Sequence, residues 1–371
     1  MSQEEFLKSA QNQFDDALPF VIYRKPNTLV VKGLFQNNDT VYTSENLTEN
    51  GFVFSPFNSE KKTVLIPFLE SVALQSNFID LKPEEYSNKI ELETLPQTKS
   101  FHINLVEKAI QAIKSNHLTK VVISREEEFL LKESNPIQLF KRLLSHYKSA
   151  FVYCWYHPKI GLWLGATPET LLTVTGNRFT TMALAGTQKY ADNLKPVWQP
   201  KEKEEQQLVT NFIVDNLNKL VSSLKVLDVE TVKAGKLLHL QTKISGTLNS
   251  NLKLVVNALH PTPAVCGLPK EKSKKFILEN ENYNREFYTG FLGEINNKEK
   301  TSRNTNRRNV ENNVYTSIKT VTNLYVNLRC MQLTDVKAKL YVGGGITKDS
   351  VPVDEWEETV NKAQTMKKVL F

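Results

Sequence analysis

The sequence predicts an α+β protein built on large, mostly antiparallel β-sheets that are flanked by helices. Strand-like alternating runs recur along the chain, a few long stretches show helical spacing, and no repeat of fixed period appears. Of the 371 residues, 40% are hydrophobic and 23% are charged, which is typical of a globular protein with ample apolar material for a core.

The first part of the chain is rich in strand patterns and poor in chemistry. Strand-like runs lie at 28–32 and 62–67, but residues 1–95 hold no recognisable constellation of reactive groups. We expect this part to pack into the same fold as the region 96–371, which holds every candidate site residue.

Helix and strand signals alternate after residue 100. A helix is expected to end near 115–116, before a strand at 120–124. Further strands are expected at 150–156, 162–164 and 171–184, the last interrupted by a turn at Gly176 and Asn177.

The clearest helix is expected over 202–224, where apolar residues form one stripe. Glu205 lies on this stripe, because it precedes Val209 by four residues and Phe212 by seven. Its carboxylate should therefore point toward the interior, where it needs a partner.

Near the C-terminus, a strand at 339–342 runs into Gly343-Gly344-Gly345, and a loop then leads to a helix from about Asp354. The glycines match neither the GxxxxGK[ST] nor the GxGxxG nucleotide motif. They predict a tight turn or a close approach of the backbone to another group.

Cysteine usage and the N-terminal sequence indicate a cytoplasmic protein. Cys154, Cys266 and Cys330 are far apart and form no CxxC pair, which is typical of free thiols in a reducing compartment. The first residues are acidic and polar, and no apolar stretch is long enough to span a bilayer. We expect neither export nor membrane insertion.

The net charge of +7 should attract anions. The stretch 296–313 holds five Lys or Arg against two Glu and few apolar residues, so we expect a solvated loop there. A nucleic-acid-binding protein is the alternative from another class, but this stretch lacks the interleaved aromatic residues that stack on bases. We therefore expect no nucleic-acid partner.

Taken singly, the candidate site residues have ordinary structural explanations. Lys120 at a strand start is typical of a surface lysine, and Glu169 after a proline could cap a turn. His239 could be a satisfied structural histidine. Glu358 and Lys362, four residues apart on a helix, could form an exposed ion pair.

Taken in order, ten segments from Phe101 to the end resemble the chorismate-utilising enzymes that feed menaquinone, siderophore, tryptophan and folate synthesis. The resemblance implies the fold of anthranilate synthase component I and aminodeoxychorismate synthase, with a variable N-terminal part. The segments are KVVISR, LGATPETLL, LAGT, KEKEEQQLV, LHLQT, LHPTPAVCGLPK, NREFYTGFLGE, YVNLRCMQL, LYVGGGI and EWEETVNKAQTM.

Three positions indicate the branch of that family. Lys120 stands where isochorismate and salicylate synthases carry a lysine, which favours water over ammonia as the nucleophile. Ala185 replaces the lysine of aminodeoxychorismate synthases, and Ala264 replaces the Thr or Ser of the amino-transferring relatives. The resemblance thus implies an isochorismate synthase, an isomerase that we expect to serve menaquinone rather than siderophore biosynthesis.

A salicylate synthase, which eliminates pyruvate from isochorismate, is the nearest alternative. The resemblance gives no reason to expect an amidotransferase subunit, and because one chain holds the whole expected site, we expect a monomer.

The resemblance also implies roles for single residues. Lys120 is expected to be the base and Glu169 the acid, which requires a pKa well below about 10.4 for the first and above about 4.3 for the second. Glu205 and Glu358 are expected to bind Mg²⁺, a hard cation that takes oxygen ligands. Chorismate is expected to contact Gly186, Thr187, His239, Ala264, Val265, Tyr288, Arg329, Gly343, Gly345 and Lys362.

Within that set, Arg329 is expected to lie in a strand and to bind the enolpyruvyl carboxylate, assisted by backbone N–H groups around Gly343 and Gly345. The chain departs from the family's KDRxEH motif, because KEKEEQ keeps the glutamate as Glu205 but replaces the histidine with Gln206. The stretch 296–313 is a second departure, since relatives turn there more briefly.

Overall fold

The computed structural model describes residues 1–79, 96–131, 135–190, 196–234, 237–301 and 317–370. Two large sheets lie at its centre, and every strand pairing in the described residues is antiparallel. The predicted α+β class is confirmed. None of the helices in the described part combines the length and apolar composition that a membrane crossing requires.

The first sheet has nine strands; three from the start of the chain lie together at one edge, and the strands from the C-terminal half lie toward the other. In spatial order they are β15 (Gly267–Leu268), β7 (Lys120–Leu130), β19 (Lys337–Ile346), β18 (Cys330–Leu333), β9 (Gly161–Thr167), β8 (Phe151–His157), β1 (Phe20–Arg24), β2 (Val30–Gln36) and β6 (Ser71–Asn77).

The second sheet has ten strands, one of which, β13 (Glu230–Ala234), pairs with β14 off the main path. The others, in spatial order, are β12 (Val221–Val226), β14 (Leu237–Leu248), β11 (Arg178–Lys189), β10 (Thr170–Thr175), β17 (Ser317–Val326), β16 (Phe291–Thr301), β4 (Gly51–Ser55), β5 (Thr63–Pro67) and β3 (Tyr42–Ser44).

An aromatic core joins the two sheets. Phe54 of β4 contacts Trp155 of β8 and Trp163 of β9, with ring centroids 5.2 and 6.0 Å apart. Phe151 of β8 stacks on Tyr325 of β17 at 4.0 Å. Large flat side chains on facing strands remove much apolar area from water per residue, so this cluster holds the sheets together.

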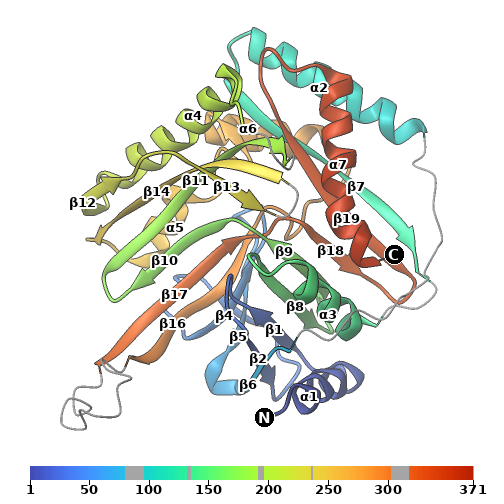
Figure 1. Cartoon of the computed structure of the whole chain (residues 1–371), viewed down its shortest axis with the longest axis vertical. Helices are drawn as coiled ribbons and strands as arrows, with labels where there is room; N and C mark the ends of the chain where they lie inside the picture. The colour runs from blue at the N-terminus through green and yellow to red at the C-terminus, as the bar shows by residue number, and fades with distance from the viewer. Residues whose placement is uncertain (80–95, 132–134, 191–195, 235–236, 302–316, 371) are drawn as a thin grey trace.

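Helices cover the outer faces of both sheets, giving a layered molecule (Figure 1). On the first sheet lie α1 (Gln3–Asp15), α2 (Pro96–Lys114), α3 (Pro136–His146), α6 (Lys270–Asn280) and α7 (Pro352–Leu370). The second sheet is covered by α4 (Pro200–Leu217) and α5 (Leu252–Leu259), and a short 3-10 helix, Phe68–Glu70, precedes β6.

The start of the chain contributes strands to both sheets. β1 pairs with β8 in the first sheet, and β4 pairs with β16 in the second. The division between residues 95 and 96 stays a prediction.

The helix expected over 202–224 is shorter than predicted. α4 ends at Leu217, and the chain then pairs with β14 as β12, with Val221 opposite Leu248. Leu220, Val221 and Leu224 still pack against the same apolar cluster, so their spacing suits a strand as well as a helix. Periodicity alone could not separate the two.

Strands take the place of the turn that was one alternative at the glycines and of part of the loop expected at 296–313. Gly343, Gly344 and Gly345 lie inside β19, paired with β7, so the alternative of a tight turn was wrong. Residues 296–301 continue β16, and 297–301 pair with β17 rather than forming a loop, because ladder pairing satisfies their backbone despite the polar side chains. Residues 302–313 of the same stretch lie outside the described residues.

Candidate functional site

One pocket of about 200 Å³ opens where the two sheets, α4 and α7 meet. It gathers twelve of the predicted site residues, which come from segments spread over most of the chain. They are Glu169, Gly186, Glu205, His239, Ala264, Val265, Tyr288, Arg329, Gly343, Gly345, Glu358 and Lys362.

The two other predicted residues adjoin this pocket. Lys120, the first residue of β7, is fully buried and not a surface lysine. Its Nζ lies 2.5 Å from Glu205 Oε1, across 85 residues of sequence. Thr187 follows Gly186 in β11, but its side chain lies outside the described residues.

Glu205 projects from α4 into the pocket, as the helical stripe predicted. Burial alone would raise the pKa of this carboxyl, but the adjacent Lys120 ammonium, with Lys362 and Lys201 nearby, holds the pKa below its usual value. Glu205 is therefore ionised at neutral pH, and Lys120 is the partner that a buried carboxylate requires.

Glu169 lies in the connection between β9 and β10 and is 4% exposed. Its backbone is fixed, because its carbonyl accepts a hydrogen bond from Val326 N at 3.0 Å. Burial raises the pKa of Glu169 to about 8, although Lys120 and Arg329 act against the rise. This carboxyl therefore carries a proton at neutral pH.

Arg329 does not lie in a strand, contrary to the prediction. It occupies the connection between β17 and β18 with a left-handed backbone, φ 47°, and its carbonyl accepts a hydrogen bond from Ala166 N at 3.0 Å. The reversal at this residue turns its side chain away from the alternation of a strand and into the pocket.

His239 of β14 connects Arg329 to the strand β11. A bulge at Gly186 in β11 breaks the pairing with β14, and the Gly186 carbonyl lies 3.0 Å from His239 Nδ1. Burial and Arg329 lower the pKa of His239 to about 4, so the imidazole is neutral. Nδ1–H thus donates to Gly186, which leaves Nε2 to accept from Arg329 Nη2 at 3.2 Å.

The glycines of β19 let the backbone approach the reactive side chains. A Cβ on Gly345 would lie 3.0 Å from Lys120 Cε and 3.1 Å from Glu205 Oε1. A Cβ on Gly343 would lie 3.1 Å from Tyr288 Oη. The close approach predicted from the sequence is confirmed.

α7 presents a polar face to the pocket at its N-terminal half. Glu358 and Lys362 form an ion pair of 2.6 Å, and Lys362 also donates to the Gly343 carbonyl at 2.9 Å. Lys362 lowers the pKa of Glu358, while the negative charge of Glu205 acts in the opposite direction. The two carboxylates therefore lie close enough to repel each other, which a cation between them would relieve.

The donor set fits a hard cation. Glu205 and Glu358 offer carboxylate oxygens at one end of the pocket, and Glu355 Oε2 is buried with no hydrogen-bond partner in the described part of the chain. Within those residues, no group of three or more His, Cys, Asp or Glu side chains forms a closed metal site. Two carboxylates with substrate and water oxygens would suit Mg²⁺.

Sequence reasoning missed three polar residues here. Lys201 and Glu202 line the pocket, and Glu355 lies behind Gly344, whose added Cβ would be 3.4 Å from Glu355 Oε2. Glu202 and Glu355 precede Glu205 and Glu358 by three residues each, and this shared spacing places each pair on one helix face. The repeated E-x-x-E spacing was the available signal.

The remaining wall is apolar and aromatic. Tyr288 stacks on Tyr341 with ring centroids 5.5 Å apart, and Val265 is buried beside the partly buried Ala264. Gln206, at the family's histidine position, is buried and donates to the Ala183 carbonyl at 3.1 Å, which ties α4 to β11. It supports the wall from outside the pocket.

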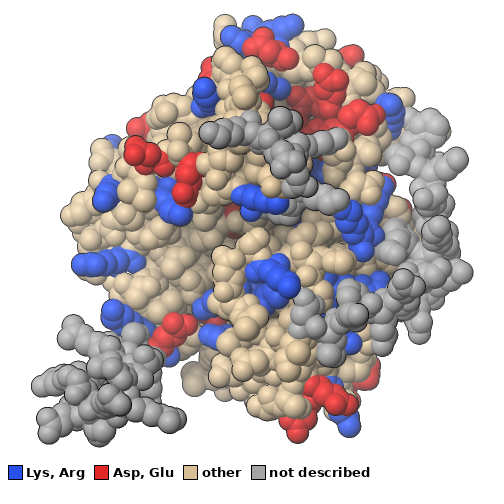
Figure 2. Space-filling model, in the orientation of Figure 1, with Lys and Arg blue, Asp and Glu red and all other residues tan. Residues whose placement is uncertain are grey.

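The face in Figure 2 has basic and acidic side chains interspersed among uncharged ones. Its charges do not gather into one basic stripe of the kind that tracks a phosphate backbone.

Cations, ionised carboxylates and one protonated carboxyl around a half-apolar cavity are typical of an enzyme that binds a small anionic metabolite. The chain belongs to the chorismate-binding enzyme family, whose models match residues 53–302 and 314–368.

Among curated proteins, the chain is 27% identical to the isochorismate synthase MenF of Haemophilus influenzae over 82% of this chain and 70% of that protein. It is 28% identical to the isochorismate synthase EntC of Escherichia coli over 75% and 69%, respectively. The solved structure of MenF, the menaquinone-specific isochorismate synthase of Escherichia coli, has the same fold, with a TM-score of 0.75, 21% identity, and coverage of 95% and 89%.

Proposed function

We propose that this enzyme is a cytoplasmic, magnesium-dependent isochorismate synthase, an isomerase that converts chorismate into isochorismate. The observation that carries the proposal is Glu169, a buried carboxyl in the pocket wall whose pKa is raised to about 8. Such a group stays protonated at neutral pH and is suited to protonate a departing hydroxyl.

The reaction moves a hydroxyl without changing the composition of the substrate. An oxygen–carbon bond forms between water and C2, both double bonds of the conjugated ring diene shift by one position, and the bond from C4 to its hydroxyl breaks. The Lys120 ammonium, paired with Glu205 in the resting site, first releases a proton to solvent. The neutral amine then accepts the proton that the attacking water loses, and Glu169 gives its proton to the leaving hydroxyl. Each transfer is typically worth about 10²- to 10⁴-fold in rate.

The dianionic substrate is held at both carboxylates. Arg329, oriented by His239, binds the enolpyruvyl carboxylate with backbone N–H groups near Gly343 and Gly345. Glu205 and Glu358 would hold Mg²⁺, which would supply positive charge for the ring carboxylate. Gly186 and Lys362 line the same pocket and are proposed to contact the substrate there, with Thr187 as a further proposed contact. Ala264, Val265 and Tyr288 are proposed to form the ring wall.

Small side chains support water rather than ammonia as the nucleophile. Ala185 lines the pocket where aminodeoxychorismate synthases carry a lysine, and Ala264 stands where the amino-transferring relatives have a hydroxyl. Isochorismate synthases among the relatives support the same branch. We assign the product to menaquinone biosynthesis, propose a monomer, and take the three buried free cysteines as support for a cytoplasmic protein.

Product analysis tests the proposal. Purified protein is incubated with chorismate and Mg²⁺, and the products are resolved by chromatography. Isochorismate as the end product is expected. Salicylate with pyruvate would move the enzyme to the salicylate branch, and no consumption of chorismate would refute the proposed activity.

A further inference from the structure

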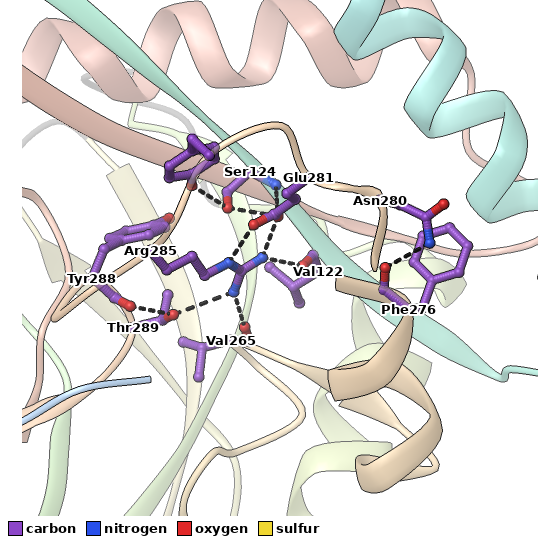
Figure 3. Close-up of polar contacts among 10 residues, drawn as sticks. Val122, Ser124, Val265, Phe276, Asn280, Glu281, Arg285, Tyr288 and Thr289 are labelled. Carbon is purple, nitrogen blue, oxygen red and sulfur yellow. Dashed lines mark hydrogen bonds and ion pairs between the residues drawn. The ribbon is translucent and has the colours of Figure 1, made fainter. Parts of the chain in front are cut away.

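A buried ion pair between Glu281 and Arg285 lies in the segment between α6 and β16 (Figure 3). Arg285 Nε donates to Glu281 Oε2 at 2.8 Å, and Nη2 donates to Oε1 at 2.5 Å. Both side chains are only 2% exposed. This two-bond geometry fixes the plane of the guanidinium as well as its position.

The other donors of Arg285 hold three points of the pocket wall. Nη2 donates to the Val122 carbonyl at 2.7 Å, and Nη1 donates to the Val265 carbonyl at 3.0 Å and to Thr289 Oγ1 at 3.2 Å. Val122, Val265 and Thr289 all line the pocket, and they belong to three separate segments of the chain. One side chain therefore sets the spacing of three parts of the wall.

Glu281 extends the same connection to β7. Its Oε1 accepts hydrogen bonds from both N and Oγ of Ser124 at 2.8 Å, and Ser124 Oγ lies 2.7 Å from Tyr283 Oη. Ser124 pairs with Gly343 across the β7–β19 ladder. The ion pair thus fixes the middle of the sheet that carries Lys120 and Gly345.

The wall segment that Arg285 holds is strained. Thr289 is β-branched and has a left-handed backbone, φ 60°, a conformation that is strained for such a residue. Its N–H donates to the Asn327 carbonyl at 2.9 Å, and its carbonyl lies 3.0 Å from His260 Nε2. Such a residue keeps its conformation only when its surroundings hold it, and Arg285 supplies one of these contacts.

Arg285 has no donor left for a substrate. Its five N–H groups are matched by the five contacts to Glu281, Val122, Val265 and Thr289. Burial acts to lower the pKa of Arg285, but Glu281 outweighs it and raises the pKa, so the pair stays ionised. Arg285 can therefore affect the substrate only by positioning the residues of the pocket wall.

We propose that Arg285, held by Glu281, is a positioning residue that sets the shape of the chorismate pocket by fixing the Val122, Val265 and Thr289 segments. This inference rests on the proposed function for the identity of the ligand. A lysine at this position would keep the charge but lose the planar fork, and the three segments would no longer share one anchor.

Arg285→Lys is compared with Arg24→Lys. Arg24 is also buried and donates to two backbone carbonyls, Leu144 at 2.9 Å and Tyr147 at 2.7 Å, neither of which lines the pocket. Both variants should lower Tm. For each, the Kd for chorismate with Mg²⁺ is measured by calorimetry, and KM, kcat and the pH profile are measured by turnover.

We expect Arg285→Lys to raise Kd and KM for chorismate about tenfold or more, since a misplacement of 1 Å can cost roughly 10²-fold. The pH at which activity falls should stay unchanged, because Glu169 is not touched. Arg24→Lys should leave Kd and KM within about twofold of wild type.

A lower Tm with wild-type Kd and KM in Arg285→Lys would overturn the positioning role. If this variant does not fold, Glu281→Gln, which weakens the same anchor, is judged by the same criterion. A wild-type protein that binds chorismate without converting it would refute the proposed reaction, while the comparison of Kd values would still decide the role of Arg285.

Discussion

At the scale of single residues, the environment of Glu169 determines its chemistry. Its side chain has left water, and the nearby Lys120 and Arg329 do not fully compensate for that loss. By contrast, Glu205 is ion-paired with Lys120 and stays charged. Two carboxyls in one pocket are thus held in opposite protonation states. The protonated Glu169 can act as an acid, and the ionised Glu205 can bind a metal ion.

Replacing the acid should slow the reaction with little effect on binding. Glu169→Gln keeps the shape of the side chain but cannot release a proton to the leaving hydroxyl, so kcat should fall about 10²- to 10⁴-fold. Steady-state kinetics check this, with chorismate binding measured on the same protein. A variant with wild-type kcat would exclude Glu169 as the acid.

The same residue predicts the direction of the pH dependence. Because the pKa of Glu169 is raised to about 8, the protonated form that acts as the acid predominates below that pH and is lost above it. The plot of kcat/KM against pH should therefore fall as the pH rises through about 8. In Glu169→Gln this fall should disappear from the residual activity, and a fall that persists would have another origin.

At the scale of elements, the alternation of β19 separates two kinds of glycine. An added Cβ on Gly345 points at the Lys120–Glu205 pair, whereas one on Gly344 points to the opposite face and meets Glu355 Oε2 at 3.4 Å, an ordinary contact. A substitution at Gly344 is therefore a matched control for the same substitution at Gly345.

Gly345→Ala should displace the Lys120–Glu205 pair by a few tenths of an ångström and lower kcat/KM about tenfold. Gly344→Ala should retain most of the activity. The two variants are compared by kinetics and by thermal unfolding. Equal loss of activity in both would show that the effect arises from the strand and not from the site.

α7 offers a similar comparison for the metal. Glu358 faces the pocket, while its neighbour Glu357 is exposed and lies 3.9 Å from Lys99. Glu358→Gln should weaken Mg²⁺ binding by more than roughly tenfold, and Glu357→Gln should leave it unchanged. The rise in Tm on adding Mg²⁺ reports this independently of activity. Equal Tm shifts in both variants would remove Glu358 from the metal site.

Helices and strands were predicted correctly where the local pattern of apolar and polar residues determines the secondary structure. The strands of β8, β9, β10 and β11 follow from alternation and a turn at Gly176. The prediction failed beyond Leu217, where the chain turns to pair with β14, because apolar spacing there suits both structures. Val221 pairs with Leu248, which is 27 residues away, and a partner at that distance cannot be predicted from the local sequence.

At the scale of the whole molecule, the site depends on contacts between distant segments. Local pattern indicated that Glu205 points inward, but the other residue roles came from resemblance to a family. Lys120 meets Glu205 across 85 residues, and His239 meets Arg329 across 90. Arg285 reaches Val122 across 163 residues, so neither its burial nor its partners could be predicted from neighbouring sequence.

The most direct test of the central claim follows the oxygen of the attacking water. Wild-type protein is incubated with chorismate and Mg²⁺ in ¹⁸O-labelled water, alongside Lys120→Ala, and the product is analysed by mass spectrometry. Isochorismate that carries one ¹⁸O atom, formed by the wild type and not by the variant, is the predicted result. Isochorismate without the label, or labelled product formed equally well by Lys120→Ala, would contradict water addition assisted by Lys120.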